Sequence, residues 1–240
     1  MVSQHSYGLL KAVDAKDAMG DSLKLVMLRN PWGDFEWNGD WGDNSNDWTD
    51  DIKKQVGYED AEGLFWMSYE DVCKYFGRIQ ICNINDEYQY SFLKASHNRD
   101  SFSLMRLMVS GEGEHTISVS QTDSRCFSRH SEYDYSNCRM IVMKIEEDAD
   151  NVEELKVKYM KGGSGWERES HIMFDNLPKG DYYVYVEIDW NESTEDTDFC
   201  VTCYGSSKTF YLRDEKSLYD KNELLRKVYA SKAKQTPEGV

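Results

Sequence analysis

The hydrophobic pattern of the second half of this chain most limits what it can fold into, because it repeats every two residues. Between Tyr182 and Trp190, apolar side chains occupy every second position, so one face of an extended strand is apolar. His115 to Ser120 alternates in the same way. Three further stretches have the length and apolar content of strands: Cys138 to Ile145, Phe199 to Tyr204 and Thr209 to Leu212. This pattern predicts an antiparallel β-sandwich.

The first 84 residues combine strand and helix signals. Apolar runs from Tyr7 to Val13 and from Leu23 to Leu28 predict two neighbouring strands joined by a polar turn at residues 14–21. Asp34 to Trp48 is expected to be a loop. Two short helices are predicted, one capped by Thr49 and one capped by Ser68 and ended by Gly77, followed by a strand from Ile79 to Ile84.

The polar segment from Asn85 to Gln89 is the predicted boundary between two domains. We therefore expect a mainly β protein with short helices, of the α+β type, divided into residues 1–84, a sandwich at 85–213, and a charged helical or disordered tail at 214–240. Within the tail, the segment from Glu215 to Ala230 is compatible with a helix.

Composition limits the partners of the chain. Its 44 acidic and 28 basic residues give a formal charge of -16, which argues against nucleic acid as a partner and suits divalent cations or basic proteins. A solvated acidic surface explains the same balance. The N-terminus has no signal-peptide pattern and no apolar run approaches 18 residues, so a cytoplasmic location with reduced cysteines is expected.

His5 and Asn30 are the candidate catalytic residues. His5 opens the motif His-Ser-Tyr-Gly just before the first predicted strand, and Asn30 opens Asn-Pro-Trp-Gly at the end of the second. In an antiparallel pair these positions lie at the same end, within hydrogen-bonding reach. A papain-type mechanism needs a thiolate, a histidine that takes and returns its proton, and an amide that orients the imidazole. Each motif alone is also compatible with an ordinary histidine and an ordinary turn.

These motifs, taken together, resemble the calpain family of cysteine proteases. The resemblance rests on the run from Asn30 to Trp41, on Asp43, on Phe65-Trp66-Met67-Ser68, and on His5-Ser6-Tyr7, although alanine or glycine is commoner at the second position of that last motif. Residues 1–84 look like the second protease subdomain, a papain-like β-barrel half-domain. The segment from Leu177 to Tyr182 resembles a turn of the calpain-type, C2-like sandwich, and details resemble the small-optic-lobes branch.

The resemblance implies a role for each site residue. His5 would be the general base and acid, Asn30 its orienter, and Trp32 a lid over their hydrogen bond between the two protease halves. No cysteine fits the nucleophile, because the family places that thiol in a Gly-rich motif ending Cys-Trp, which does not occur here. Cys73 and Cys82 are expected to be buried small hydrophobic residues. The nucleophile would belong to a cysteine-bearing first protease subdomain, and the substrates would be proteins.

Calcium is the cofactor that the resemblance suggests. Its side-chain ligands would be Glu36, Asp43 and Glu62, in a stretch whose carboxylate density suits a cation that takes six to eight oxygens. Leu64 stands where conventional members are usually acidic, which removes one ligand. A solvated acidic loop is the alternative.

Two functions follow from the sequence. The first is the C-terminal part of an intracellular, calcium-dependent calpain-like cysteine endopeptidase, inactive alone because the nucleophile is absent. The second is a catalytically inactive regulatory or binding module that acts through its acidic loops and sandwich. A second acidic cluster near residues 187–198 would make an electrostatic contact with basic residues of the protease core or a calcium-dependent contact with a membrane, unless it is simply an exposed loop. Its members are Glu187, Asp189, Glu192, Glu195, Asp196 and Asp198.

Overall fold

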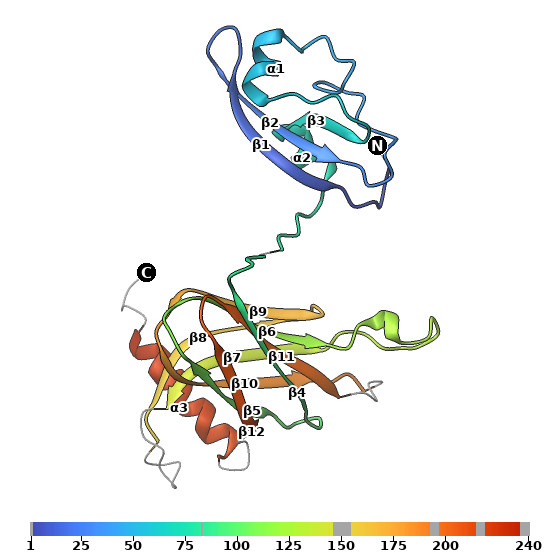
Figure 1. Cartoon of the computed structure of the whole chain (residues 1–240). Coiled ribbons are helices and arrows are strands. Elements are labelled where there is room, and N and C mark those ends of the chain that lie inside the picture. The colour runs from blue at the N-terminus through green and yellow to red at the C-terminus, as the bar shows by residue number, and fades with distance from the viewer. Residues whose placement is uncertain (1, 83, 146–154, 193–196, 215–218, 236–240) are drawn as a thin grey trace. The chain divides into compact units, whose positions relative to one another are not determined.

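The structure is a computed structural model that describes residues 2–82, 84–145, 155–192, 197–214 and 219–235. The chain is mainly β and forms two compact units, Met1–Asn83 and Ile84–Val240 (Figure 1). None of the helices in these described ranges is both long and apolar enough to span a membrane.

The first unit is a three-stranded antiparallel sheet with two short helices. The sheet order is β1-β2-β3. Side chains on its two faces form separate small cores, one with α1 and one with α2. The bounds are β1 Gly8–Lys16, β2 Ser22–Arg29, α1 Asp50–Val56, β3 Leu64–Ser68 and α2 Tyr69–Tyr75.

Both helices of this unit begin where the sequence predicts. The side chain of Thr49 accepts a hydrogen bond from the backbone N–H of Ile52, and Ser68 does the same for Asp71. Ile52 and Val56, four residues apart, are the buried face of α1. Gly57 ends this helix in the left-handed conformation, at a φ of 65°.

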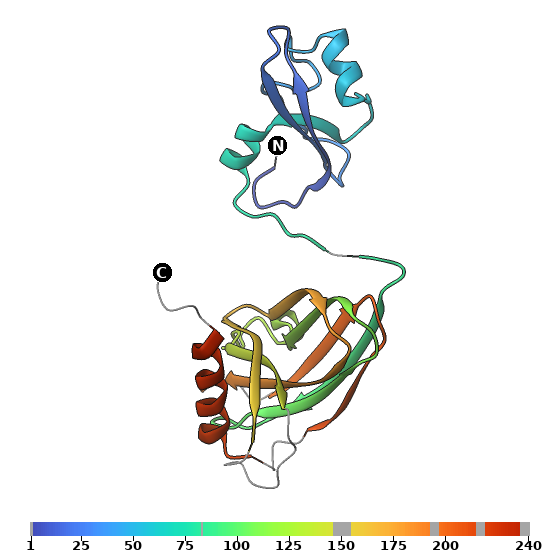
Figure 2. The same ribbon diagram turned by 90° about the vertical axis from the view of Figure 1, so that its left-hand side faces the viewer.

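The second unit is the expected sandwich, with a helix added to one outer face (Figure 2). One sheet has the order β12-β5-β10-β7-β8 and the other β4-β11-β6-β9, all antiparallel. The bounds are β4 Gln89–Ser96, β5 Ser103–Val109, β6 Gly113–Gln121, the 3-10 turn η1 Ser124–Cys126, β7 Asn137–Ile145, β8 Val157–Gly165, β9 Glu169–Leu177, β10 Gly180–Asp189, β11 Asp198–Gly205, β12 Thr209–Asp214 and α3 Lys221–Gln235.

The main core lies between the two sheets. Val184, Val186 and Ile188 of β10, and Trp190 just after it, point into it, as the alternation predicts. The opposite face of β10 is also buried, because Tyr183 and Tyr185 pack beneath Leu224 and Val228 of α3. The face of β10 that points away from the main core is therefore not exposed to solvent but forms a second core under the helix.

The predicted strand from Ile79 to Ile84 is wrong. The described residues of this segment have no strand conformation, and Ile79, Ile81 and Ile84 are 61%, 83% and 79% exposed. Alternating apolar residues favour an extended conformation, but a strand also needs a neighbour for its backbone N–H and C=O groups. No described strand pairs with this segment.

Other boundaries also differ from the expectation. β1 continues to Lys16, so the turn is shorter than predicted and runs from Asp17 to Asp21, where the Asp17 carboxylate accepts the N–H groups of Met19 and Asp21. The tail helix, Lys221–Gln235, ends five residues later than the segment from Glu215 to Ala230 that was expected to be helical. Residues 215–218 of that segment lie outside the described part of the chain.

Candidate active site

The first pair of strands brings His5 and Asn30 together. Gly8 at the start of β1 pairs with Arg29 at the end of β2, so the residues just outside both strands lie at one end of the hairpin. His5 Nε2 and Asn30 Oδ1 are 2.9 Å apart, a hydrogen-bond distance. The backbone pairing thus converts a separation of 25 residues into a side-chain contact.

Hydrogen bonds on all sides fix the orientation of the Asn30 amide. Its Nδ2 donates to the backbone oxygen of Asp34, which leaves Oδ1 as the acceptor facing His5. The same Oδ1 accepts the backbone N–H of Trp32 at 3.1 Å. Asn30 is only 1% exposed. His5 Nε2 must therefore carry the proton, and Nδ1 is the nitrogen that can accept one.

Two aromatic rings hold the His5 imidazole. The ring centroid of Trp32 lies 4.0 Å from that of His5, at an interplanar angle of 35°. The edge of Tyr7 meets the His5 ring at 4.9 Å and 81°, and Tyr7 in turn packs against Phe65 and Phe76. Tyr7 connects the candidate base to the buried core. Sequence reasoning missed Tyr7, and its position in the His5 motif was the available signal.

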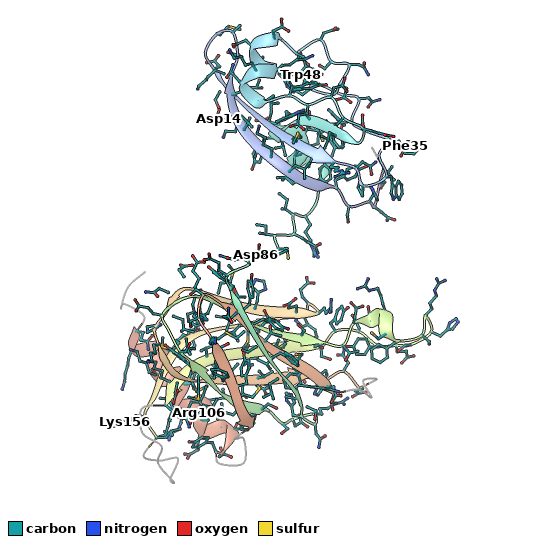
Figure 3. The ribbon with its side chains drawn as sticks, viewed as in Figure 1. Asp14, Phe35, Trp48, Asp86, Arg106 and Lys156 are labelled. Carbon is teal, nitrogen blue, oxygen red and sulfur yellow. The ribbon has the colours of Figure 1, made fainter. Side chains whose placement is uncertain are left out.

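The turn after Asn30 needs glycine at two points. Gly33 has a φ of 81° and closes the turn with a hydrogen bond to Asn30 O. A Cβ on Gly63, which has a φ of 80°, would lie 2.8 Å from Asn30 O. Phe35 also has a positive φ and is 63% exposed, and Figure 3 shows it at the outer edge of this unit. Trp32 is likewise exposed, at 61%.

The cysteines differ partly from the expectation. Cys73 and Cys82 are exposed, so the prediction that they are buried is wrong. Cys73 lies on the outer side of a helix only two turns long, and Cys82 lies in the unpaired segment before the sandwich. Burial raises the pKa of Cys138 to about 12 and that of Cys203 to about 11, so both thiols stay protonated at neutral pH.

Two of the three predicted calcium ligands face each other. A hydrogen bond joins the carboxyl groups of Glu36 and Asp43, and the Glu36 carboxylate also accepts the backbone N–H of Gly63 at 2.5 Å. Burial, followed by the contact with Asp43 and the charge of Asp60, raises the pKa of Glu36. Tyr58 donates to Asp43 at 3.3 Å, and its own pKa rises to about 12, first from burial and then from the Asp43 charge.

Glu62 does not complete this pair. It is exposed, and its carboxylate lies beside Gly33. Across the described residues, no three His, Cys, Asp or Glu side chains gather closely enough to hold a metal ion. Glu36, Asp43 and Glu62 are thus not assembled as a three-carboxylate site here.

The second acidic cluster is not a single exposed loop. Glu187 lies on β10, where its carboxylate pairs with Arg139 at 3.1 Å and with Lys221 of α3 at 2.5 Å, and accepts from Tyr185 at 3.0 Å. This residue therefore ties the helix to the sandwich. Asp198 pairs with Lys94, whereas Glu195 and Asp196 lie outside the described residues.

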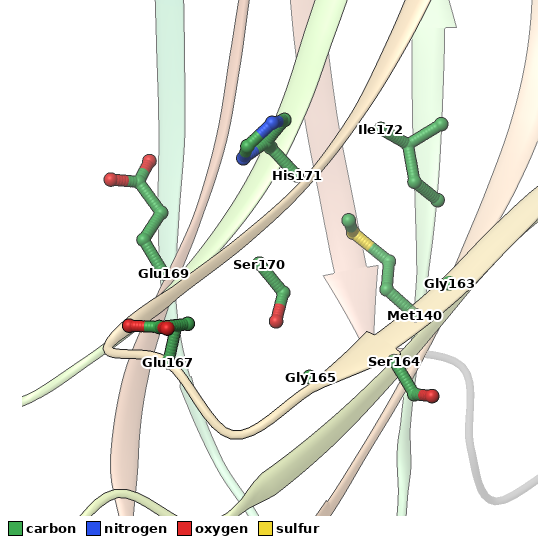
Figure 4. Close-up of a pocket in the computed structure, with 9 residues that line it drawn as sticks. All are labelled: Met140, Gly163, Ser164, Gly165, Glu167, Glu169, Ser170, His171 and Ile172. Atoms are coloured by element: carbon green, nitrogen blue, oxygen red, sulfur yellow. The ribbon is translucent and has the colours of Figure 1, made fainter. Parts of the chain in front are cut away.

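A pocket of about 240 Å³ opens in the second unit between β8 and β9. Small residues of β8 line one side, and Ser170, His171 and Glu169 lie along the other (Figure 4). Figure 4 shows these polar groups spread along the strand and its turn. The pocket lacks the gathered base and orienter that His5 and Asn30 form in the first unit.

The geometry of the first unit defines the histidine and asparagine half of a papain-type cysteine protease site. Comparisons with known proteins agree with this class. Residues 1–83 match the family described as calpain family cysteine protease. The chain is 32% identical to the calpain-2 catalytic subunit of Bos taurus over 90 residues, 34% to calpain-9 of Rattus norvegicus over 91, and 39% to calpain-8 of Mus musculus over 90.

Each of these matches covers 36% of this chain and 13% of the relative. The first unit is thus similar to the calpain family of cysteine proteases. The chain matches only about an eighth of the length of these relatives.

Proposed function

We propose that this chain supplies the base half of a calpain-like cysteine endopeptidase that cleaves intracellular proteins. The observation that carries the proposal is the 2.9 Å contact between His5 Nε2 and Asn30 Oδ1, with the Trp32 ring against the imidazole. The nucleophilic cysteine comes from a first protease subdomain outside these 240 residues. In support, none of the six cysteines is followed by tryptophan.

The proposed chemistry uses both imidazole nitrogens. Nδ1 of His5 takes the proton of the thiol, and the thiolate attacks the substrate carbonyl. The imidazolium then gives the proton to the leaving amine, and water later releases the acyl group from sulfur. Throughout these steps the proton on Nε2 stays hydrogen-bonded to Oδ1 of Asn30, which keeps the ring in its catalytic orientation.

Contacts of the imidazole with an indole and a phenol ring support this role. Trp32 excludes water from one side of the hydrogen bond, which strengthens it by lowering the local dielectric. The contact with Tyr7 also limits rotation of the imidazole. A neutral amide orienter leaves the positive charge of the imidazolium free to stabilise the thiolate.

Reconstitution tests the proposal. The chain is mixed with a cysteine-bearing first subdomain of a calpain, and cleavage of a fluorogenic peptide is followed with and without a thiol alkylating agent. Thiol-dependent cleavage is expected, and His5→Ala should lower it by about 100-fold or more, the usual contribution of a general base. His130→Ala, which removes an exposed histidine of the sandwich, is the matched control and should leave the rate unchanged.

Calcium dependence is the finer part of the proposal. Glu36 and Asp43 hold two carboxyl groups against each other, and a divalent cation between them would relieve the repulsion that contributes to the raised pKa of Glu36. The pair alone offers fewer oxygens than calcium takes, so Glu62 would have to join it or water would complete the shell. We propose that Glu36 and Asp43 are the smallest set of protein ligands that this calcium site would have.

The alternative function is a catalytically inactive regulatory or binding module. The acidic composition is compatible with it, because a charge of -16 suits basic partners whether or not peptide bonds are cleaved. The reconstitution separates the two functions. Cleavage that disappears in His5→Ala supports the peptidase, whereas a stable complex without cleavage supports the module.

A further inference from the structure

The two outer faces of the sandwich differ. α3 packs on the outer face of the five-stranded sheet, where Leu224 and Val228 are buried. Figure 2 shows this helix on one side of the sandwich and the strands β4 and β11 on the other. The outer face of the four-stranded sheet β4-β11-β6-β9 carries exposed aromatic side chains.

The strand register places these aromatic residues on one grid. Phe92 is opposite Thr202, which is opposite Ser118, which in turn is opposite His171. The neighbouring row of the grid is Tyr90, Tyr204, Thr116 and Met173. Alternate residues of the same strands, such as Val201 and Ile117, point into the core. Both rows therefore face away from the core.

The aromatic strip consists of Tyr88, Tyr90, Phe92 and Tyr204. The rings of Tyr90 and Phe92 lie 6.0 Å apart at 32° and are 62% and 65% exposed. Tyr204 is anchored, because its hydroxyl accepts the backbone N–H of Asn85 and donates to the backbone oxygen of Asn85. The strip is thus held in place and open to a partner.

Negative charges border the strip. The hydroxyl of Tyr88 donates to the carboxylate of Glu114. Glu169 lies on β9, at the opposite edge of the sheet from β4, and also lines the pocket of Figure 4. Its charge nevertheless reaches the strip, because burial, then the charges of Cys200 and Glu169, raise the pKa of Tyr90. Asp86, labelled in Figure 3, and Glu87 are exposed just before β4. Lys94 is the cation of this face on β4, and it is paired with Asp198 at 2.5 Å.

We propose that the outer face of the sheet β4-β11-β6-β9 binds an extended, arginine-containing protein segment. Planar guanidinium groups stack on aromatic rings and pair with carboxylates, and the strip offers both. In an extended segment, every second side chain points the same way and is spaced by about 6.7 Å. The 6.0 Å between the rings of Tyr90 and Phe92 fits an arginine at every second position.

A peptide of four Arg-Ser repeats tests the proposal on the full chain. Its binding is measured by fluorescence anisotropy at 150 mM salt, beside peptides of four Lys-Ser and four Glu-Ser repeats. The arginine peptide should bind best, because ammonium groups stack less well and glutamates are repelled. Tyr90→Ala and Phe92→Ala should each weaken binding about two- to fivefold, the range of exposed cation–π contacts. Glu169→Gln should also weaken it, about twofold to threefold.

Matched variants show whether a loss is specific. Phe210→Ala removes a half-exposed aromatic of β12 in the other sheet, and Glu59→Gln removes an exposed carboxylate of the first unit. Both should leave binding unchanged. Phe92→Leu keeps an apolar side chain, protects folding, and should still lose the preference for arginine over lysine.

Three results would overturn the proposal. The first is equal binding of the arginine and lysine peptides, unaffected by the Tyr90→Ala, Phe92→Ala double variant, which would indicate unspecific charge attraction. The second is a dimer in sedimentation that Phe92→Ala dissolves, which would make a second copy the occupant. The third is binding to phosphatidylserine vesicles, without peptide binding, that Phe92→Ala abolishes, which would make the face a membrane contact.

Discussion

The amide oxygen of Asn30 accepts two hydrogen bonds, from Nε2 of His5 at 2.9 Å and from the backbone N–H of Trp32 at 3.1 Å. One side chain therefore fixes both the imidazole and the backbone of the residue whose ring packs on that imidazole. Asn30 therefore orients His5 directly, through their hydrogen bond, and indirectly, by positioning Trp32.

Asn30→Ala should consequently lower the activity of the reconstituted peptidase more than it lowers stability. We expect a loss of about 100-fold, the effect of a misplaced catalytic group. The pH profile should change as well, because the ring can then adopt either tautomer. Nitrogen-detected NMR of the His5 ring in this chain alone checks the tautomer. An unchanged protonation pattern at Nε2 in Asn30→Ala would contradict the proposed orientation.

The sequence predicted the contact between His5 and Asn30 because both residues flank strands of a hairpin. That argument needs only the antiparallel pairing. The family resemblance predicted Trp32 over this hydrogen bond, whereas the contact of Tyr7 with His5 depends on side-chain packing that no residue pattern encodes. Likewise, the sequence supplied three acidic residues for calcium, but the loop positions two of them together and leaves Glu62 apart.

The fold was predictable where local chemistry and tertiary packing agree. The capping residue Thr49 and the two acidic residues after it predicted α1, and the alternation of apolar and polar residues predicted β10. β8 was missed because Gly162, Gly163 and Gly165 are poor strand formers, although pairing with β7 holds them extended. The strand predicted at Ile79 failed for the opposite reason, because a good local pattern found no partner strand.

Thiol accessibility offers a test of the cysteine assignments. Cys73, Cys82 and Cys126 are exposed, so iodoacetamide should alkylate them first at pH 8. Cys138 and Cys203, whose pKa values burial raises to about 12 and about 11, should react only after unfolding in denaturant. Peptide mapping by mass spectrometry identifies the order. Early labelling of Cys138 would show that the sandwich core opens more readily than its packing indicates.

Acid should affect the two units in opposite directions. Because the folded-state pKa of Glu36 is raised, the folded state holds this proton more tightly than the unfolded chain does. Its favourable contribution is full below the ordinary value of 4.5 and is lost as pH rises through the raised pKa. The first unit should thus melt higher at pH 5 than at pH 7, and Glu36→Gln should remove this difference.

Glu187 gives the second unit the reverse dependence. Burial by itself raises the pKa of this carboxyl, but Lys221, Tyr185 and Arg139 together lower it. The contribution of Glu187 to stability is present at pH values above its ordinary pKa of 4.5 and is lost as pH falls through the lowered pKa. The melting temperature of the second unit should fall between pH 4.5 and pH 3, and it should fall less in the Glu187→Gln variant. Amide hydrogen exchange resolves the two units. A parallel response of both units would contradict these assignments.

Calcium should stabilise the first unit if Glu36 and Asp43 bind it. Binding to the folded state alone adds about 2.7 kcal/mol at 100 times the dissociation constant. The melting transition should therefore rise by several degrees, with a change in tryptophan fluorescence, because five of the seven tryptophans lie in this unit. Asp43→Asn should abolish the rise and Glu59→Gln should keep it. An unchanged melting temperature at millimolar calcium would remove calcium from the proposal.

α3 should be an integral part of the sandwich, and Leu224→Ala tests this. Leu224 is fully buried against the outer face of the five-stranded sheet, so truncation leaves a cavity under the helix. Such a change costs about 2–5 kcal/mol. Asn222→Ala, at an exposed position two residues earlier, is the matched control and should change little. Chemical denaturation of the full chain measures both. Equal stability of the two variants would mean that the helix rests on the sheet without contributing to its fold, and polar contacts such as the ion pair between Glu187 and Lys221 would then attach it.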